Sequence, residues 1–187
     1  MRKLIEATFI TLDGVIGDTS PSTAPQASPA VWGAPYWDDE HAKYAYDLLF
    51  SSDALLLGRV TYQGFAQAWP ARKFEFADRI NSLPKYVASH TLKEPLEWNA
   101  TLLKGDIAAE VARLKEQPGQ NILKYGSGEL DGLLLQHRLV DEYHFWIFPV
   151  VIGGGQHLLE GLDTTHLKLL RTTNFNSGIT VNTYAPK

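Results

Sequence analysis

Cysteine is absent from this chain of 187 residues, and its absence excludes disulfides, thiolate chemistry and zinc sites that need cysteine ligands. The lack of disulfides fits a reducing compartment, so we expect a cytoplasmic protein. The six histidines never recur as His-x-x-x-His, the spacing that places two ligands on one helix face. We therefore predict that the protein holds no metal.

Long apolar runs are also missing, since nothing approaches the roughly 18 uninterrupted apolar residues that cross a membrane. The first residues are basic and then apolar, but this run contains Glu6 and closes at Asp13-Gly14 without a small-residue cleavage signal. We interpret the run as a first strand and expect no membrane contact.

A surplus of positive charge is the next absence. The chain has 17 Lys and Arg against 21 Asp and Glu, with a formal net charge of -4, and its basic residues are scattered. Because a nucleic-acid surface needs clustered positive charge, we expect no nucleic-acid partner. The length fits a single substantial core, and we predict one domain over residues 1–187.

Two common catalytic signatures are missing as well. The chain has neither the Gly-x-Ser-x-Gly nucleophile turn nor the Gly-x-x-x-x-Gly-Lys phosphate loop. These absences argue against a hydrolase and against a nucleoside triphosphatase.

The sequence does contain an alternation of short apolar runs and helix-patterned segments. It predicts strands over residues 3–11, 53–57, 85–89, 100–103, 121–125 and 140–152, and helices over residues 39–50, 62–69, 74–83, 106–117 and 129–137. The last two runs, residues 167–173 and 178–184, predict an antiparallel β-hairpin. This order indicates an α/β fold with a mostly parallel sheet and an antiparallel edge.

One predicted strand ends in Gly126-Ser127-Gly128 and passes directly into a helix. Glycines let the backbone approach a ligand closely, and the free N–H groups of a first helical turn attract an anion. The same sequence is also compatible with a tight strand-to-helix connection that binds nothing. Strand ends in open α/β sheets are where ligands collect, which favours a phosphate site.

Two further strand ends carry polar side chains. Gly58, Arg59 and Thr61 follow one apolar run, and Ser89 and Thr91 follow the next. Arg59 could pair with a carboxylate, as surface arginines usually do, but its position directly after a glycine at a strand end favours phosphate binding. Two phosphate-type ends in one domain predict a ligand with more than one phosphate.

Asp13 stands at the mouth of the first strand. It can form a simple Asp-Gly turn, or it can deliver a proton to a substrate at the edge where the other strands end. Residues Asp38, Asp39 and Glu40 are expected to cap a helix. The segment from Gly17 to Pro35 is rich in Pro, Ser and Ala, and we predict a mobile lid or disordered insertion there.

Five sequence pieces, taken in order, resemble the dihydrofolate reductase-like proteins related to the reductase domain of bacterial riboflavin biosynthesis. They are Thr11-Leu12-Asp13-Gly14, Leu57-Gly58-Arg59-Val60-Thr61-Tyr62, Lys85-Tyr86-Val87-Ala88-Ser89, Gly126-Ser127-Gly128, and Leu139-Val140-Asp141-Glu142 with its continuation to Gly154. The resemblance spans nearly the whole chain. It implies a central sheet flanked by helices, NADPH as the hydride donor, and a homodimer.

The resemblance also assigns roles to the predicted site residues. Gly58, Arg59, Thr61 and Ser89 would hold the 2′-phosphate side of NADPH, and Thr91 lies beside them. The turn 126–128 would hold the pyrophosphate, and Asp13 would lie near the nicotinamide and a small-molecule substrate.

The chain departs from that family in two regions. The cysteines of the deaminase domain that accompanies the riboflavin reductase are absent, and a Pro/Ser/Ala-rich segment replaces the region that grips the pterin in dihydrofolate reductases. The sequence therefore predicts an NADPH-dependent reductase of a small heterocyclic or imine/carbonyl substrate. The alternative is a non-catalytic protein that binds a nucleotide or a flavin-type ligand.

Overall fold

The computed structural model describes residues 1–17 and 32–187 of the chain. Most of the predicted lid, residues 18–31, lies outside this described part. The ends of that segment are described: Gly17 belongs to a short strand, and Trp32 is buried in the core.

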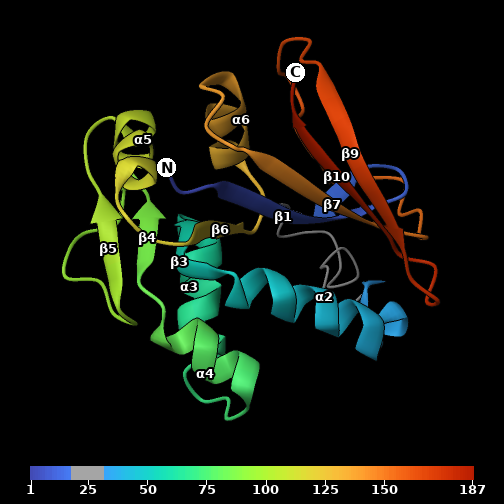
Figure 1. Cartoon of the computed structure of the whole chain (residues 1–187), viewed down its shortest axis with the longest axis horizontal. Helices are drawn as coiled ribbons and strands as arrows, with labels where there is room; N and C mark the ends of the chain where they lie inside the picture. Colours follow the sequence, from blue (N-terminus) through green and yellow to red (C-terminus); the bar gives the residue numbers. More distant parts are fainter. Residues whose placement is uncertain (18–31) are drawn as a thin grey trace.

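In the described residues, eight strands form one sheet in the order β5-β4-β3-β6-β1-β7-β10-β9 (Figure 1). The first six strands in this order are parallel, and the last two are antiparallel to their neighbours. Their bounds are β1 Leu4–Thr11, β3 Ser52–Gly58, β4 Lys85–Ala88, β5 Ala100–Leu103, β6 Asn121–Tyr125, β7 Glu142–Phe148, β9 Leu167–Asn174 and β10 Thr180–Pro186. The predicted mostly parallel sheet and the C-terminal hairpin are confirmed.

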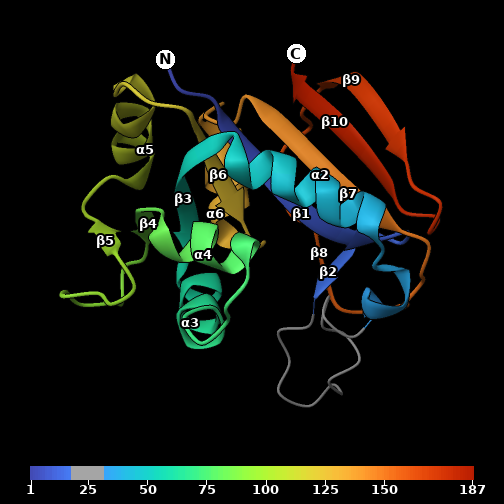
Figure 2. The same cartoon turned by 60° about the horizontal axis from the view of Figure 1, so that its bottom comes forward.

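Helices cover both faces of the sheet (Figures 1 and 2). On one face lie α2 (Asp39–Phe50), α3 (Arg59–Ala68) and α4 (Glu75–Ser82), and on the other lie α5 (Ile107–Glu116) and α6 (Glu129–Gln136). Each face therefore has its own apolar core. Because the central strands are buried on both sides, their sequences are continuous apolar runs rather than alternating ones, as in Leu55-Leu56-Leu57 of β3.

The helices begin where local chemistry favours a helix start. Asp38 caps α2 by accepting a hydrogen bond from the backbone N–H of His41 (2.9 Å), while Asp39 and Glu40 occupy the first turn. Asp106 caps α5 in the same way through the N–H of Ala109 (3.1 Å). Both caps were predicted, and both satisfy backbone donors that the helix itself leaves free.

Two predictions of element length are wrong. The strand predicted over residues 140–152 is β7, which spans only Glu142–Phe148. Pro149 has no N–H for a sheet ladder, and the N–H of Val150 turns back to the carbonyl of Phe148 (2.8 Å). Helix α3 begins at Arg59 rather than at Tyr62, because Gly58 already ends the strand as the N-cap residue.

A second, two-stranded sheet was not predicted. It pairs β2 (Val15–Gly17) with β8 (Gln156–His157) in antiparallel register. Gly155 lies so close to β2 that a Cβ there would stand 2.8 Å from Val15 Cγ1 and 3.0 Å from the Gly17 carbonyl oxygen. This approach fixes the glycine run 153–155 against the loop after β1.

Among the described residues, no helix has the length and apolar character needed to cross a membrane.

Candidate functional site

Strands β3 and β6 are neighbours in the sheet, but the helices that follow them cover opposite faces of the sheet. Helix α3 follows β3 onto one face, and α6 follows β6 onto the other. A crevice forms at the carboxyl ends of two parallel strands whose following helices diverge in this way, and ligands of open α/β sheets bind there. The topology therefore places a ligand site between residues 58–61 and 125–129.

A cavity of about 510 Å³ occupies this position. It is lined by all eight residues that the sequence predicted for a cofactor: Gly58, Arg59, Thr61, Ser89, Thr91, Gly126, Ser127 and Gly128. These residues come from three strand ends that are up to about seventy positions apart in the chain, and β4, β3 and β6 are adjacent in the sheet. The fold thus brings the predicted residues together.

The glycines of the cavity have different reasons to be glycine. Gly126 has φ +80°, and a Cβ there would overlap the Thr61 side chain. A Cβ at Gly58 or Gly128 would instead meet no atom of the described residues within 4 Å, so both glycines border open space in this part of the chain. Position 126 requires glycine because the backbone there approaches Thr61 closely. The space beside Gly58 and Gly128 leaves room for a ligand.

Two helices, α3 and α6, begin at this cavity. Among the described residues, no side chain caps the N-terminus of α3, whose first residue is Arg59. The first turns of α3 and α6 both line the cavity. Unpaired N–H groups and the positive end of the helix dipole attract anions, so the site is electrostatically suited to phosphate.

Arg59 is exposed, and its guanidinium donates to Gln63 Oε1 (3.2 Å) one turn along α3. Within residues 1–17 and 32–187 it forms no ion pair. The competing role of Arg59 as a partner of a carboxylate therefore finds no support in this part of the chain, and the cation is available at the cavity rim.

Ser89 ends β4 and turns the chain. Its Oγ accepts hydrogen bonds from the backbone N–H groups of Thr91 and Leu92, both at 3.1 Å. The turn holds the hydroxyls of Ser89 and Thr91 3.4 Å apart at the cavity wall. Both hydroxyls are positioned to contact a ligand beside Arg59.

Sequence reasoning missed the residues under the 126–128 turn. The Lys124 ammonium donates to the carbonyl oxygen of Gly126 (2.7 Å) and to Asp131, and Asp131 in turn accepts from the N–H of Gly128. Glu6 of β1 completes this buried cluster, with its Oε2 3.8 Å from Lys124 Nζ. The sequence signals for this cluster were a lysine inside an apolar strand and an aspartate at position N3 of a helix. Neither signal indicates which residue the side chain contacts.

The protonation of Glu6 follows from its surroundings. Its side chain is fully buried, and burial raises the pKa of Glu6 well above its usual range; Lys124 opposes this effect and Asp131 reinforces it. One ammonium faces two carboxyl groups, and Asp131 holds the closer contact. Glu6 is therefore the carboxyl group of the cluster that burial most favours in its neutral form.

Asp13 does not line the cavity. Its carboxylate accepts from the Thr11 hydroxyl (2.5 Å) and from the N–H groups of Ile152 (3.2 Å) and Gly153 (2.7 Å). These hydrogen bonds, led by that of Thr11, lower the pKa of Asp13. The geometry favours the turn role that its sequence also allowed, because an ionised, fully engaged acceptor fastens the loop after β1 to the loop after β7.

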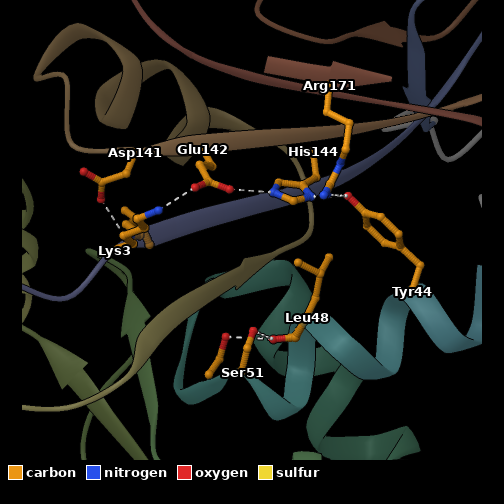
Figure 3. A network of polar contacts seen from close by, with 10 residues as sticks. Lys3, Tyr44, Leu48, Ser51, Asp141, Glu142, His144 and Arg171 are labelled. Carbon is orange, nitrogen blue, oxygen red and sulfur yellow. Dashed lines mark hydrogen bonds and ion pairs between the residues drawn. The ribbon is translucent and has the colours of Figure 1, made fainter. Parts of the chain in front are cut away.

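A second polar network lies on the face of the sheet that α2 covers (Figure 3). His144 of β7 hydrogen-bonds Tyr44 of α2 through Nδ1 (2.7 Å) and lies 3.3 Å from Glu142 through Nε2, and Arg171 of β9 donates to the Tyr44 hydroxyl (3.2 Å). Burial lowers the pKa of His144. This network joins α2 to β7 and β9 and does not reach the cavity, so we interpret it as structural.

A neighbouring cavity of about 560 Å³ lies between α6 and the β2/β8 sheet. It shares Gly128, Glu129, Leu133 and Gln156 with the first cavity. Its remaining wall combines apolar side chains, which are Ile16 and the leucines of residues 158–162, with the polar side chains of Gln136, His157 and Glu160. A ligand extending along the N-terminus of α6 would pass from one cavity into the other. Within the described residues, no group of three histidine, aspartate or glutamate side chains could hold a metal ion.

This sheet order, with its site at the strand ends, defines a dihydrofolate reductase-like α/β fold. Dihydrofolate reductase from Enterococcus faecalis, solved in complex with NADP(H), superimposes with a TM-score of 0.62 at 14% identity, covering 99% of this chain and 96% of the other. A candidate riboflavin biosynthesis protein from Shewanella sp. PV-4 superimposes with a TM-score of 0.70 at 21% identity, covering 99% of each chain.

The model of the family described as RibD C-terminal domain matches residues 2–181 of the chain, so the chain belongs to this family. The resemblance stated from the sequence is thereby confirmed. A relative in Bacillus subtilis strain 168, the uncharacterized protein YyaP, is 32% identical over 139 residues, which is 71% of this chain and 73% of YyaP.

Proposed function

We propose that the protein is an NADPH-dependent reductase of a small heterocyclic or imine/carbonyl substrate. One observation carries the proposal: a single cavity gathers the eight residues predicted for a dinucleotide from three separate strand ends. Family membership and the NADP(H) complex of a protein with the same fold support the choice of ligand. NADPH supplies the hydride when bound.

The residues divide the ligand into two parts. Arg59, Thr61, Ser89 and Thr91 would bind the 2′-phosphate, because a guanidinium and three hydroxyls form charge-assisted hydrogen bonds with phosphate oxygens. The turn 126–128 and the N-terminus of α6 would bind the pyrophosphate. The Ser127 hydroxyl has no hydrogen-bond partner in the described part of the chain, and it is a free donor for this purpose.

Asp13 remains the proton source predicted from the sequence, but its three hydrogen bonds favour a structural role. This observation supports the alternative function, a non-catalytic protein that binds a nucleotide or flavin-type ligand. The two functions share the binding site and differ in turnover. A screen of heterocyclic, imine and carbonyl compounds for NADPH oxidation, monitored by absorbance, separates them.

The binding proposal is tested by titrating the protein with NADPH and NADH. We expect Arg59→Ala to weaken NADPH binding by about tenfold or more, because a charge-assisted contact contributes about 1.5 to 3 kcal/mol. NADH has no 2′-phosphate, so its affinity is expected to change little. Gln63→Ala, which removes only the neighbour of the Arg59 guanidinium, is the matched control and should bind both dinucleotides as the parent does.

An equal loss of NADPH and NADH affinity in Arg59→Ala would contradict the assignment of the 2′-phosphate to this residue. Failure of the parent protein to bind either dinucleotide would overturn the proposed function itself.

We further propose a cytoplasmic homodimer with no nucleic-acid or membrane partner. The absence of cysteine fits the location, and an edge strand with exposed leucines supports the dimer.

A further inference from the structure

Three buried ionisable residues form a cluster next to the 126–128 turn. Glu6, Lys124 and Asp131 are each at most 2% exposed, and they come from β1, β6 and α6. Buried charges are costly unless they are paired and hydrogen-bonded. A cluster of this kind placed directly under a ligand-binding turn invites a functional explanation.

Each end of the turn is held by one member of the cluster. Lys124 fixes the carbonyl of Gly126 (2.7 Å), and Asp131 fixes the N–H of Gly128. Ser127, between these two anchors, keeps its hydroxyl uncommitted. Lys124 and Asp131 also bind each other, so the two anchors cannot move independently.

We propose that Glu6, Lys124 and Asp131 act as a unit that positions the 126–128 turn for a pyrophosphate, with Lys124 as the positioning residue on which the geometry depends. This inference rests on the proposed function, because it assigns the turn to the pyrophosphate of NADPH. Lys124 and Asp131 line the cavity and occupy the Gly126 carbonyl and the Gly128 N–H. They therefore fix the conformation of the turn and leave the Ser127 hydroxyl for the ligand.

The charge of the unit matters because an anion binds directly above it. With Glu6 neutral, the ammonium of Lys124 balances the carboxylate of Asp131. Ionisation of Glu6 would add one uncompensated negative charge in a medium of low dielectric constant, and the resulting field would oppose a pyrophosphate.

Among the residues that the structure describes, the groups that face Glu6 include no second cation. They are Thr8 on its own strand, Lys124 on β6, Asp131 on α6 and Tyr143 on β7. Within residues 1–17 and 32–187, the Oε2 atom of Glu6 has no hydrogen-bond partner. Dinucleotide affinity is therefore expected to fall as pH rises and Glu6 loses its proton.

The test compares two ligands that share only part of the site. NADPH carries both the 2′-phosphate and the pyrophosphate, whereas adenosine 2′-monophosphate carries the 2′-phosphate alone. A displaced turn would weaken NADPH but leave adenosine 2′-monophosphate unaffected. Affinities of the full chain for both ligands are measured by calorimetric titration, with the thermal midpoint recorded for every variant.

The main variant is the charge-balanced double substitution Lys124→Met with Asp131→Asn. It leaves no ionised side chain unpaired beside neutral Glu6, so it avoids the severe destabilisation expected when one partner of a buried pair is removed. We expect NADPH affinity to fall about tenfold or more and adenosine 2′-monophosphate affinity to stay within about twofold.

Lys85→Met is the matched control. Lys85 is also a fully buried lysine of the same sheet, but it lies at the opposite end of its strand from the cavity and donates to Asn81. Its removal should change stability while leaving NADPH affinity within about twofold. A comparable loss of NADPH affinity in this control would overturn the positioning role by showing that any buried lysine has the same effect.

A pH profile supplies a readout that a purely structural role would not move. NADPH affinity of the parent is expected to decline as rising pH ionises Glu6, and Glu6→Gln, which stays neutral at every pH, should flatten that decline. Identical profiles in the two proteins would overturn the charge argument.

Unchanged NADPH affinity in the double variant, with the parent binding normally, would overturn the inference and leave the proposed function standing. If the parent bound neither NADPH nor adenosine 2′-monophosphate, the proposed function would fail and this inference would fail with it.

Discussion

The carboxylate of Asp13 accepts hydrogen bonds from the Thr11 hydroxyl and from two backbone N–H groups of the loop after β7. Thr11 in turn accepts from the N–H of Val15 (2.9 Å). At the scale of single residues, Asp13 is therefore a hydrogen-bond acceptor for both the end of β1 and the loop after β7. A proton donor needs the opposite state, a carboxyl group that still holds its proton at working pH.

Asp13→Asn separates the two roles. An amide keeps one oxygen acceptor but places an NH₂ group against backbone donors, so we expect the free energy of unfolding to fall by about 1 kcal/mol. Urea unfolding followed by tryptophan fluorescence measures this change, and Asp39→Asn, on the exposed first turn of α2, is the control. A variant as stable as the parent that loses turnover by tenfold or more would restore Asp13 as the proton source.

At the scale of elements, β4 and the long loop to β5 are joined through a buried lysine. Lys85 Nζ donates to the carbonyl of Asn81 (2.8 Å) at the end of α4 and lies 4.0 Å from the centre of the Trp98 ring. Trp98 Nε1 also donates to the Asn81 side chain (2.7 Å). These contacts anchor the Trp98 end of the loop from Ser89 to Asn99 to α4, whereas Ser89 and Thr91 at the other end of the loop line the cavity.

Burial lowers the pKa of Lys85 to about 8, and this shift predicts a pH-dependent stability. In the unfolded chain the ammonium deprotonates near pH 10.4, about where free lysine does. Between these two values the unfolded state binds more protons than the folded state, so the free energy of unfolding rises with pH.

We therefore expect stability to increase between pH 8 and 9.5, below the range in which tyrosines of the unfolded chain ionise. Denaturant unfolding at a series of pH values measures this rise, and Lys85→Met should remove it. Parallel curves for the parent and the variant would show that Lys85 titrates normally.

At the scale of the whole molecule, the two ends of the sheet differ. The cavity lies near β4, β3 and β6, whereas β9 forms the opposite edge (Figure 1). Strand β9 is largely exposed, with Leu169 and Leu170 at 52% and 48% exposure. An exposed edge strand with apolar side chains is a surface that proteins usually cover or block with charge.

The proposed homodimer is expected to use this edge. Leu169→Lys with Leu170→Lys should convert a dimer into a monomer in light scattering at micromolar concentration, because two charges would be buried in a self-complementary interface. Since the edge lies away from the cavity, NADPH affinity should be retained. A parent protein that is monomeric at all concentrations tested would contradict the dimer.

The sequence by itself determined the succession along the chain of the main-sheet strands and the helices, both predicted helix caps and eight of the residues that line the cavity. These features depend on local chemistry: a glycine after a strand, an aspartate before a helix, a run of leucines within a buried strand. Such preferences act over a few residues and can be recognised without knowing what lies opposite.

Only the tertiary structure decided which distant groups meet. The pairing of β2 with β8 joins segments about 140 residues apart, and the close approach of Gly126 to Thr61 brings the turn after β6 against the first turn of α3. The cluster of Glu6, Lys124 and Asp131 exists because β1 lies beside β6 in the sheet and α6 packs over both strands. A buried charge is tolerated only where its partner lies within hydrogen-bonding distance, and that distance is set by the packed fold rather than by position along the chain.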